Sequence, residues 1–357
     1  MQRNDIACWL LQQWTKNTLW QFLLRPVSWT FSAIAAVRRG LYSAGILRSE
    51  KLPVPVIVVG SIAVGGSGKT PTLIALVLAL QQQGFKPGVI SRGYGADANG
   101  IADEPALIMA RTGVPVVCDA RRVQAGKRLL TLHPQVNIIL SDDGLQHYGL
   151  RRDIELVVLD GARGPGTAAV LPAGPFREPI SRMFAAPPNV VRAVVWQGAP
   201  NADWQDCLDA NLRAALTTRG FNMRLGSERF LQLMNAENAL SVADFKLKTS
   251  HNVIAACAGI AHPARFFKNL KDRNINLKSC TEFADHHVFN AADLAFPDVD
   301  IIVMTQKDAV KCMQFNDPRI WFMQVDALFD DAFWTWFFNT IEAQKIRKQL
   351  CRLTQNY

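Results

Sequence analysis

The sequence predicts an α/β fold in which helices flank a mostly parallel sheet. Apolar, β-type runs alternate with helical segments along much of the chain, and the first such run leads directly into a glycine-rich loop and a helix. Strands that are buried on both faces have continuous apolar runs of this kind, and the strand–loop–helix connection is typical of P-loop NTPase-like sheets. A second α/β pattern after residue 250 predicts a smaller C-terminal α/β domain.

Composition places the chain among folded proteins of about two domains. It has 357 residues, of which 49% are hydrophobic and 19% are charged, so it can bury a substantial core and is not disordered. The formal net charge of +9 fits an anionic partner, although a mildly basic surface gives the same value. The seven cysteines are irregularly spaced, which argues against a disulfide framework or a zinc site and for a reducing compartment.

The N-terminal segment, residues 1–48, mixes tryptophan with lysine and arginine. Its longest uncharged stretch, residues 26–37, has 12 residues, fewer than the roughly 20 that span a bilayer. Glutamine and lysine also interrupt the pattern of a signal peptide. The mixture favours a helix that lies in a membrane interface, and the alternative is a core-packed helix pair broken near Pro26. The tryptophans of the segment are Trp9, Trp14, Trp20 and Trp29.

A phosphate-binding loop follows the apolar run 56–59. Residues 60–71 read Gly-Ser-Ile-Ala-Val-Gly-Gly-Ser-Gly-Lys-Thr-Pro. Glycine lets the backbone N–H groups of such a loop turn inward around phosphate oxygens, and the dipole of the following helix favours the bound anion. Lys69 is expected to reach the β- and γ-phosphates, and the Thr70 hydroxyl to ligate Mg²⁺. The predicted nucleotide contacts are Gly65, Gly66, Ser67, Gly68, Lys69 and Thr70.

The other elements follow in order along the chain. Residues 161–190, rich in glycine, proline and arginine, are expected to form a long functional loop, and residues 195–250 carry weak signals. The patterns predict helices over 72–83, 104–111 and 121–132 and after Pro263, and strands over 88–91, 115–118, 136–140, 154–160, 253–260, 301–305 and 320–325.

Two acidic residues, Asp142 and Asp143, follow the predicted strand over 136–140. A P-loop enzyme holds or orients Mg²⁺ at this end of a strand, opposite its Lys-Thr pair. Because Asp-Gly is also a strong turn former, an Asx turn is the alternative. Gln146 and His147 follow closely and are candidates for contacts with nucleotide or substrate.

Asp103 and the segment Asp285-His286-His287 are candidates for proton transfer. Asp103 precedes a predicted helix, so capping alone can explain it. Paired histidines are a metal-ligand pattern, but no third ligand is evident at a useful spacing. An Asp–His pair is also the arrangement that activates a hydroxyl by proton abstraction. Local sequence leaves these alternatives open.

Several arginines are candidates for phosphate binding, since arginine matches phosphate bidentately. Arg177 lies beside Glu178 in the Pro- and Gly-rich segment 171–179, and Arg122 begins a predicted helix. An ordinary solvated arginine is the alternative for each. Residues 305–311 start a helix after a strand and are either a plain cap or a second anion site.

Together these segments resemble the tetraacyldisaccharide 4′-kinase family of lipid A synthesis. They lie in the family's order between residues 53 and about 312, and the Trp- and Arg-rich N-terminus is similar to the family's membrane-associating helix. The matching segments are 65–71, 91–95, 103–105, 142–147, 171–179, 259–267, 285–287 and 305–311.

The resemblance implies transfer of the γ-phosphoryl group of ATP to the 4′-hydroxyl of a tetraacylated glucosamine disaccharide 1-phosphate, with Mg²⁺ as the metal. It implies that Asp103 and His286 together activate the acceptor hydroxyl, with Lys69 as the third catalytic residue. The substrate or phosphate contacts assigned on this basis are Arg92, Tyr94, Arg122, Gln146, His147, Arg177 and Glu178.

The resemblance also implies the domain organisation and the location. We expect a membrane-interfacial segment over 1–48, a P-loop kinase domain over 49–215, a connecting β-ribbon over 216–245 and a smaller α/β domain over 246–357. The expected location is the cytoplasmic face of the inner membrane of a Gram-negative bacterium, with the acylated disaccharide 1-phosphate and anionic lipids as partners. No nucleic-acid partner is expected, because the basic residues form no stripe interleaved with aromatics. No obligate protein partner is evident.

Three positions depart from the family's usual pattern. Ser61 stands where the loop usually has asparagine, Ala63 where it has threonine, and Gln306 where a glutamate is usual. Lys69 and Thr70 are both present, so the three departures affect side-chain contacts near the loop and not the reaction. The alternative functions are a P-loop ATPase without a lipid acceptor and a nucleotide-gated membrane scaffold.

Overall fold

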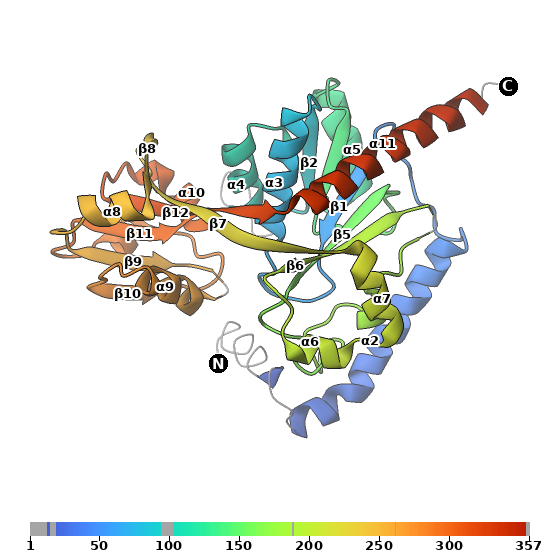
Figure 1. Ribbon diagram of the computed structural model, residues 1–357, viewed down its shortest axis with the longest axis horizontal. Helices are drawn as coiled ribbons and strands as arrows, with labels where there is room; N and C mark the ends of the chain where they lie inside the picture. Colours follow the sequence, from blue (N-terminus) through green and yellow to red (C-terminus); the bar gives the residue numbers. More distant parts are fainter. Residues whose placement is uncertain (1–12, 15–18, 94–102, 188, 261, 355–357) are drawn as a thin grey trace. The chain divides into compact units, whose positions relative to one another are not determined.

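The computed structural model describes residues 13–14, 19–93, 103–187, 189–260 and 262–354. The chain forms two compact units, and Figure 1 labels their helices and strands. The first unit comprises Met1–Arg92, Val114–Arg224 and Ala327–Tyr357, and the second comprises Gly93–Gly113 and Leu225–Asp326. The boundaries expected after residues 48, 215 and 245 remain predictions.

A parallel sheet forms the centre of the first unit. Its strands lie in the order β7-β6-β5-β1-β4-β2-β3, and each neighbouring pair is parallel. Every residue of β1, β2 and β4 is buried, as expected for strands covered on both faces. The strands are β1 (Val56–Gly60), β2 (Pro87–Ser91), β3 (Val116–Cys118), β4 (Ile138–Asp142), β5 (Ile154–Asp160), β6 (Val191–Gln197) and the start of β7 (Gly220–Gln232).

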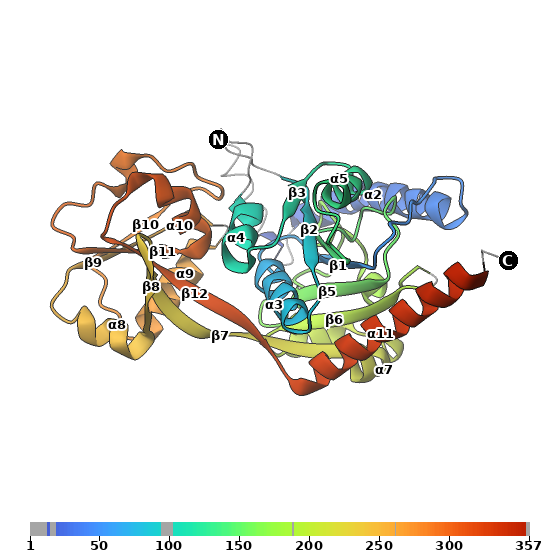
Figure 2. The same cartoon turned by 90° about the horizontal axis from the view of Figure 1, so that it is seen from above.

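Helices cover both faces of this sheet. Figure 2 shows α5 on one side of the sheet, and α3 and α11 on the other. Leu73, Leu76, Val77 and Leu80 of α3 are fully buried, at the spacing that places side chains on one helix face. The helices of this unit are α2 (Leu19–Ser43), α3 (Lys69–Gln82), α5 (Arg122–Leu132), η1 (Ile180–Met183), α6 (Ala202–Cys207), α7 (Ala210–Arg219) and α11 (Asp331–Thr354).

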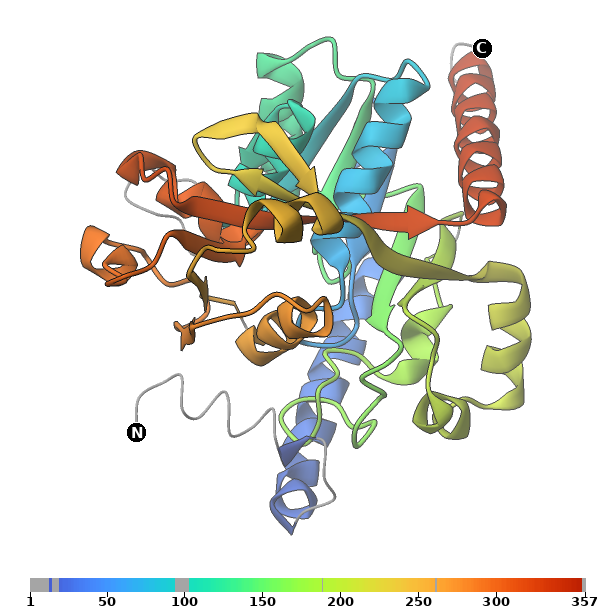
Figure 3. The same ribbon diagram turned by 60° about the vertical axis from the view of Figure 1, so that its left-hand side comes forward.

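The helix α2 is a single helix that continues through Pro26, so it is not the broken helix pair of the alternative prediction. Figure 3 shows it at the margin of the first unit. Among the described residues, none of the helices combines the length and the apolar character that a membrane span requires. Many large apolar side chains of α2 are nonetheless exposed, namely Leu19, Trp20, Phe22, Leu23, Val27, Trp29, Phe31, Ile34 and Val37.

The strands of the second unit lie in the order β10-β9-β11-β12-β7, with β8 antiparallel to β7. The pairs among β9, β10, β11 and β12 are parallel. Its core includes the stacked rings of Phe230 and Phe245, with centroids 4.0 Å apart. The strands are the rest of β7, β8 (Asn235–Ser241), β9 (Ile254–Ala258), β10 (Ser279–Glu282), β11 (Ile301–Thr305) and most of β12 (Ile320–Phe329). The helices are α4 (Asp103–Thr112), α8 (Val242–Lys248), α9 (Pro263–Asp272), η2 (Ala291–Leu294), α10 (Gln306–Cys312) and η3 (Met313–Phe315).

Candidate active site

The glycine-rich loop connects β1 to α3, and α3 begins at Lys69. Gly65 and Gly68 have φ angles of 108° and 85°, which glycine adopts far more readily than other residues. A Cβ at Gly68 would lie 2.8 Å from Gln197 Oε1. Ser67 Oγ and Gln197 Oε1 are buried without a hydrogen-bond partner among the described residues. Because buried polar atoms are almost always paired, these two atoms fit a loop that binds a polar ligand.

The segment that carries Arg177 runs along this loop and fixes its backbone. Val64 N donates to Pro175 O at 2.8 Å, and Arg177 N donates to Ile62 O at 2.6 Å. A hollow that is open to solvent lies beside the loop. Its lining includes Gly65, Gly66, Ser67, Asp160, Arg163 and Phe176.

The predicted acidic pair lies beside the loop, because Asp142 ends β4 in register with Val59 of β1. Asp143 has a φ of 45°, a strained backbone that is frequent at functional sites. Its Oδ1 lies 3.8 Å from Lys69 Nζ, and its Oδ2 accepts a hydrogen bond from Arg177 at 2.7 Å. Burial opposes ionisation of Asp143, but the charges of Lys69 and Arg177 outweigh it and hold the pKa of this carboxyl below its usual value.

The oxygen atoms at this point fit a hard cation such as Mg²⁺. Asp143 Oδ1 is buried and has no hydrogen-bond partner in the described part of the chain, and Asp142 Oδ2 accepts a hydrogen bond from Ser91 at 3.3 Å. Mg²⁺ prefers oxygen ligands and usually takes only one or two carboxylates beside water and phosphate. The described residues hold no cluster of three or more His, Cys, Asp or Glu that would bind a metal by protein ligands alone. Thr70, Asp142 and Asp143 remain the candidate donors.

Arg122 is buried, so it is not the solvated arginine of the alternative prediction. Its Nη2 donates to Asp142 O and its Nη1 to Asp119 O, both at 3.0 Å. Burial, followed by the charges of Arg122 and Arg92, lowers the pKa of His147 to about 4, so this side chain is neutral at physiological pH. Tyr94 lies outside the described residues.

Glu178 binds Gln146 directly, so two of the predicted substrate contacts form one group. Glu178 Oε1 accepts from Gln146 at 2.9 Å, and Oε2 accepts from Tyr148 at 3.0 Å and from Arg182 at 3.1 Å. Arg39 of α2 lies 3.7 Å from Oε2. Burial opposes ionisation of Glu178, but the hydrogen bonds from Gln146 and Arg182 outweigh it and hold its pKa below the usual value.

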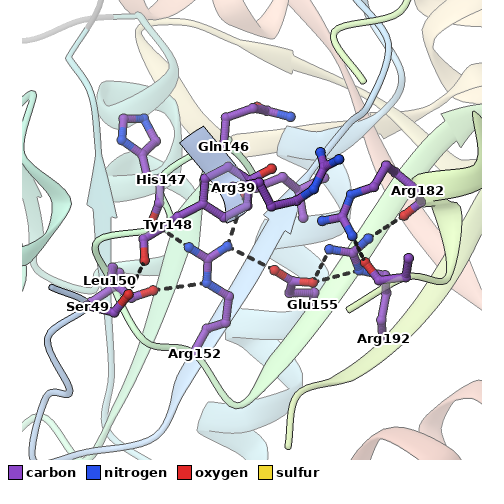
Figure 4. Close-up of polar contacts among 12 residues, drawn as sticks. Arg39, Ser49, Gln146, His147, Tyr148, Leu150, Arg152, Glu155, Arg182 and Arg192 are labelled. Atoms are coloured by element: carbon purple, nitrogen blue, oxygen red, sulfur yellow. Dashed lines mark hydrogen bonds and ion pairs between the residues drawn. The ribbon is translucent and has the colours of Figure 1, made fainter. Parts of the chain in front are cut away.

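A buried ion cluster, which the sequence did not predict, lies near this group. Glu155 of β5 is fully buried, and Figure 4 shows it between the guanidinium groups of Arg152 and Arg192. Arg152 Nη1 donates to Glu155 Oε1 at 2.9 Å, and Arg192 Nε donates to Oε2 at 2.6 Å. Arg152 also donates to three backbone carbonyls of residues 145–150, and Arg192 donates to the carbonyl of Arg182. The cluster therefore joins the loop after β4 to the segment that follows Glu178.

In the second unit, Asp103 and His286 form a pair although they are 183 positions apart in the sequence. His286 Nδ1 lies 3.1 Å from Asp103 Oδ2, and His286 has a φ of 62°. Burial opposes ionisation of Asp103, but the hydrogen bond to His286 and the charge of Lys311 hold its pKa below the usual value. The same hydrogen bond raises the pKa of His286.

The neighbouring His287 belongs to a separate pair. Its Nε2 lies 2.9 Å from Asp293 Oδ2, and its ring stacks on Phe283 with centroids 4.6 Å apart. Within the described residues no third ligand joins His286 and His287, so nothing there supports the metal-ligand alternative. In segment 305–311, Thr305 caps α10 through its side chain, as the plain-cap alternative predicted.

Comparison with known proteins agrees with the resemblance. A family described as "Tetraacyldisaccharide-1-P 4'-kinase" matches residues 20–342. The chain belongs to this family. The tetraacyldisaccharide 4′-kinase of Methylobacillus flagellatus is 39% identical over 99% of this chain and 98% of its own length. That of Shewanella sp. (strain MR-4) is 43% identical over 90% of this chain and 91% of its own length.

The fold of this family member is similar to that of LpxK from Aquifex aeolicus, a crystal structure described as an "apo" form in complex with ATP. The TM-score is 0.68 at 23% sequence identity, and the likeness covers 90% of this chain and 100% of that one. It supports the predicted α/β fold with a large, mostly parallel sheet. The roles of individual site residues rest on their chemistry and geometry.

Proposed function

We propose that this member of the tetraacyldisaccharide 4′-kinase family transfers the γ-phosphoryl group of ATP to the 4′-hydroxyl of a tetraacylated glucosamine disaccharide 1-phosphate, a step of lipid A synthesis. The observation that carries the proposal is the family match over residues 20–342. A phosphate-binding loop and an Asp–His pair are the two parts that such a reaction needs, one for the nucleotide and one for the acceptor hydroxyl.

The groups proposed to hold the nucleotide are those of the loop and its charged neighbours in the first unit. The loop N–H groups and Lys69 hold the β- and γ-phosphates, and Arg177 and Arg122 supply further positive charge. When bound at Thr70, Asp142 and Asp143, Mg²⁺ neutralises charge on the phosphates. Catalysis of phosphoryl transfer depends mainly on positioning and charge neutralisation, which these groups supply.

The groups proposed to act on the acceptor hydroxyl are Asp103 and His286 of the second unit. Asp103 takes the proton of the acceptor hydroxyl while that oxygen bonds to the γ-phosphorus, and the bond from the γ-phosphorus to the β–γ bridging oxygen breaks to release ADP. His286 Nδ1 lies 3.1 Å from the carboxylate and orients it. The lowered pKa of Asp103 keeps it ionised and able to accept the proton at neutral pH.

The proposal is tested by incubating the purified protein with radiolabelled ATP and the tetraacyl disaccharide 1-phosphate. The label is expected in the lipid product, and Lys69→Ala is expected to lower the rate by about 10²–10³-fold, as removal of one charge-stabilising group does. Release of labelled phosphate without a lipid product would instead identify a membrane-associated ATPase. Tight ATP binding without turnover would identify a nucleotide-gated scaffold.

We further propose that α2 places the protein on an acidic membrane surface. Trp29 is 69% exposed and Phe22 is 68% exposed, while Arg25 and Arg38 lie on the same helix. Arg25 lies over the ring of Phe22, with 5.7 Å from Cζ to the ring centroid. Exposed aromatic residues together with arginine suit a helix that lies in the headgroup region, where the rings are buried and arginine meets lipid phosphates.

Replacing Phe22 and Trp29 by serine is expected to weaken vesicle binding by at least about tenfold, because two large apolar side chains no longer enter the interface. Co-sedimentation with phosphatidylglycerol-containing vesicles measures it. The matched control is Leu247→Ser in the second unit, a side chain that is 79% exposed, and it is expected to bind like the unchanged protein. Equal binding by the double variant would refute the role of α2.

A further inference from the structure

Asp308 is an anchored and fully buried acid that the proposed mechanism does not use. Its Oδ2 accepts hydrogen bonds from Gly259 N at 3.0 Å and from the Thr305 hydroxyl at 2.6 Å. Its backbone N–H also donates to Thr305 Oγ1 at 3.2 Å. The side chain is therefore fixed in one position at the start of α10, and a buried carboxylate of this kind needs a cation nearby.

Lys311 supplies that cation and stands between two buried carboxylates. Its Nζ lies 2.9 Å from Asp308 Oδ1 and 3.5 Å from Asp103 Oδ2. The ammonium group also lies 5.2 Å from the centroid of the Phe289 ring, and the side chain is 13% exposed. All four residues belong to the second unit. Lys311 and His286 contact the same oxygen of Asp103, from two different elements.

The groups around Asp103 form a network in which basic and acidic side chains lie next to each other. Besides Lys311, the charged groups that face it are His286 and, farther out, Lys307. Lys307 Nζ in turn lies 3.2 Å from Asp285 Oδ1, and Asp285 lies 3.9 Å from His286 Nε2. Burial alone would favour the neutral acid at Asp103, whereas the hydrogen bond to His286 and the lysine charges favour the carboxylate.

We infer that Lys311, anchored by Asp308, is a positioning residue that keeps Asp103 ionised and aimed for proton transfer. The inference rests on the proposed role of Asp103. Lys311 acts through Asp103 and not on the phosphates. The sequence placed Lys311 only in a helix-start segment, because its contact with Asp103 joins α10 to α4 across some 200 residues of chain.

The test compares Lys311→Met with Lys311→Arg across a pH profile of kcat/KM in the lipid-transfer assay. Removing the positive charge raises the pKa of Asp103, so the acid limb of the Lys311→Met profile is expected to move to higher pH, with activity about tenfold lower at the acidic end. Lys311→Arg keeps the charge and is expected to retain the original limb. Lys278→Met is the matched control, because Lys278 is an exposed lysine of the same unit that binds the carbonyl of Asp298.

A purely structural role of Lys311 would lower activity equally at every pH, and a Lys311→Met profile that is parallel to the original would overturn the inference. If thermal unfolding shows that Lys311→Met does not fold, Lys311→Gln takes its place, because glutamine keeps a hydrogen-bond donor for Asp308. The same shift of the pH profile is expected for Lys311→Gln.

Asp103→Asn separates the two proposals. If Asp103→Asn retains full activity, the proposed base is wrong; if Asp103→Asn is inactive and the Lys311→Met limb does not move, only the role of Lys311 is wrong.

Discussion

Replacing Glu155 by alanine is expected to destabilise the protein by about 3–5 kcal/mol, the range found when one partner is removed from a buried ion pair. Glu155 is fully buried, and the side chains of Arg152 and Arg192 are only 3% and 2% exposed. The substitution would leave two guanidinium groups in the interior without their carboxylate. Urea unfolding followed by tryptophan fluorescence measures the change.

The matched control for this prediction is Glu228→Ala in the second unit. Glu228 pairs with Arg273 just as Glu155 pairs with its arginines, but the two side chains are 13% and 27% exposed. Water can solvate the Arg273 guanidinium that remains after this substitution, so the expected loss of stability is within about 1 kcal/mol. Similar losses for Glu155→Ala and Glu228→Ala would show that the buried cluster has no special weight in stability.

A second variant tests whether the buried charges or the packing of these side chains stabilise this part of the protein. Replacing Glu155 by leucine and both arginines by methionine removes all three charges of this cluster, so the loss of stability is expected to be smaller than for Glu155→Ala alone. The carbonyls that the arginines bind, including those of Leu145 and Arg182, would still lose their donors. Because these carbonyls belong to the loops that carry Gln146 and Glu178, activity is expected to fall more than stability in this variant.

Most strands of the parallel sheet were predictable, because buried parallel strands leave continuous apolar runs, but β6 was not predicted although it is buried as well. β5 and β11 have the predicted bounds, and α3 begins three residues earlier than expected because its first turn is part of the loop. β10 was not predicted, since its residues alternate between half-buried and exposed and include serine, threonine and glutamate. α11 was also not predicted, although Phe333, Phe337 and Ile341 recur at the four-residue spacing of a buried helix face.

The site was predictable only where its chemistry is local in the sequence. The loop with Lys69 has a strand, glycines and a helix in succession, so a short stretch of sequence identifies it. The pairing of Asp103 with His286 came from the resemblance to a family, since no local rule joins residues 183 positions apart. Glu155 lies inside an apolar run. One partner, Arg152, is three residues away, but the other, Arg192, is on another strand, so the sequence alone does not predict the ion cluster.

Asp103→Asn is expected to lower kcat by about 10²–10⁴-fold, the contribution typical of a positioned general base. Asparagine keeps the size of the side chain and its contact with His286 but cannot accept the proton of the acceptor hydroxyl. The KM for ATP is expected to stay within about twofold, because the groups proposed to hold the phosphates are Lys69 and the loop backbone. Single-turnover transfer from radiolabelled ATP measures the chemical step.

The chain offers a matched control for this substitution in a second Asp–His pair. Asp293 lies 2.9 Å from His287, the residue next to His286, and caps η2 together with Asn290. Asp293→Asn removes the same charge from the same kind of pair and is expected to leave kcat close to that of the unchanged protein. Equal activities of Asp103→Asn and Asp293→Asn would rule out Asp103 as the base.

The direction of the pKa shift of Asp103 predicts how activity depends on pH. Burial opposes ionisation of Asp103, but the hydrogen bond to His286 and the charge of Lys311 outweigh it, so the folded protein holds the pKa below that of a free aspartate. Activity should therefore persist as the pH falls through the usual range of an aspartate and decline only below it. The hydrogen bond to Asp103 raises the pKa of His286, so the paired histidine gains a proton more readily. As the pH rises through this raised pKa, His286 loses its charge and its interaction with Asp103 weakens. His286→Ala should remove the hydrogen bond and shift the acid limb to higher pH, in the same direction as Lys311→Met, since both groups stabilise the same carboxylate.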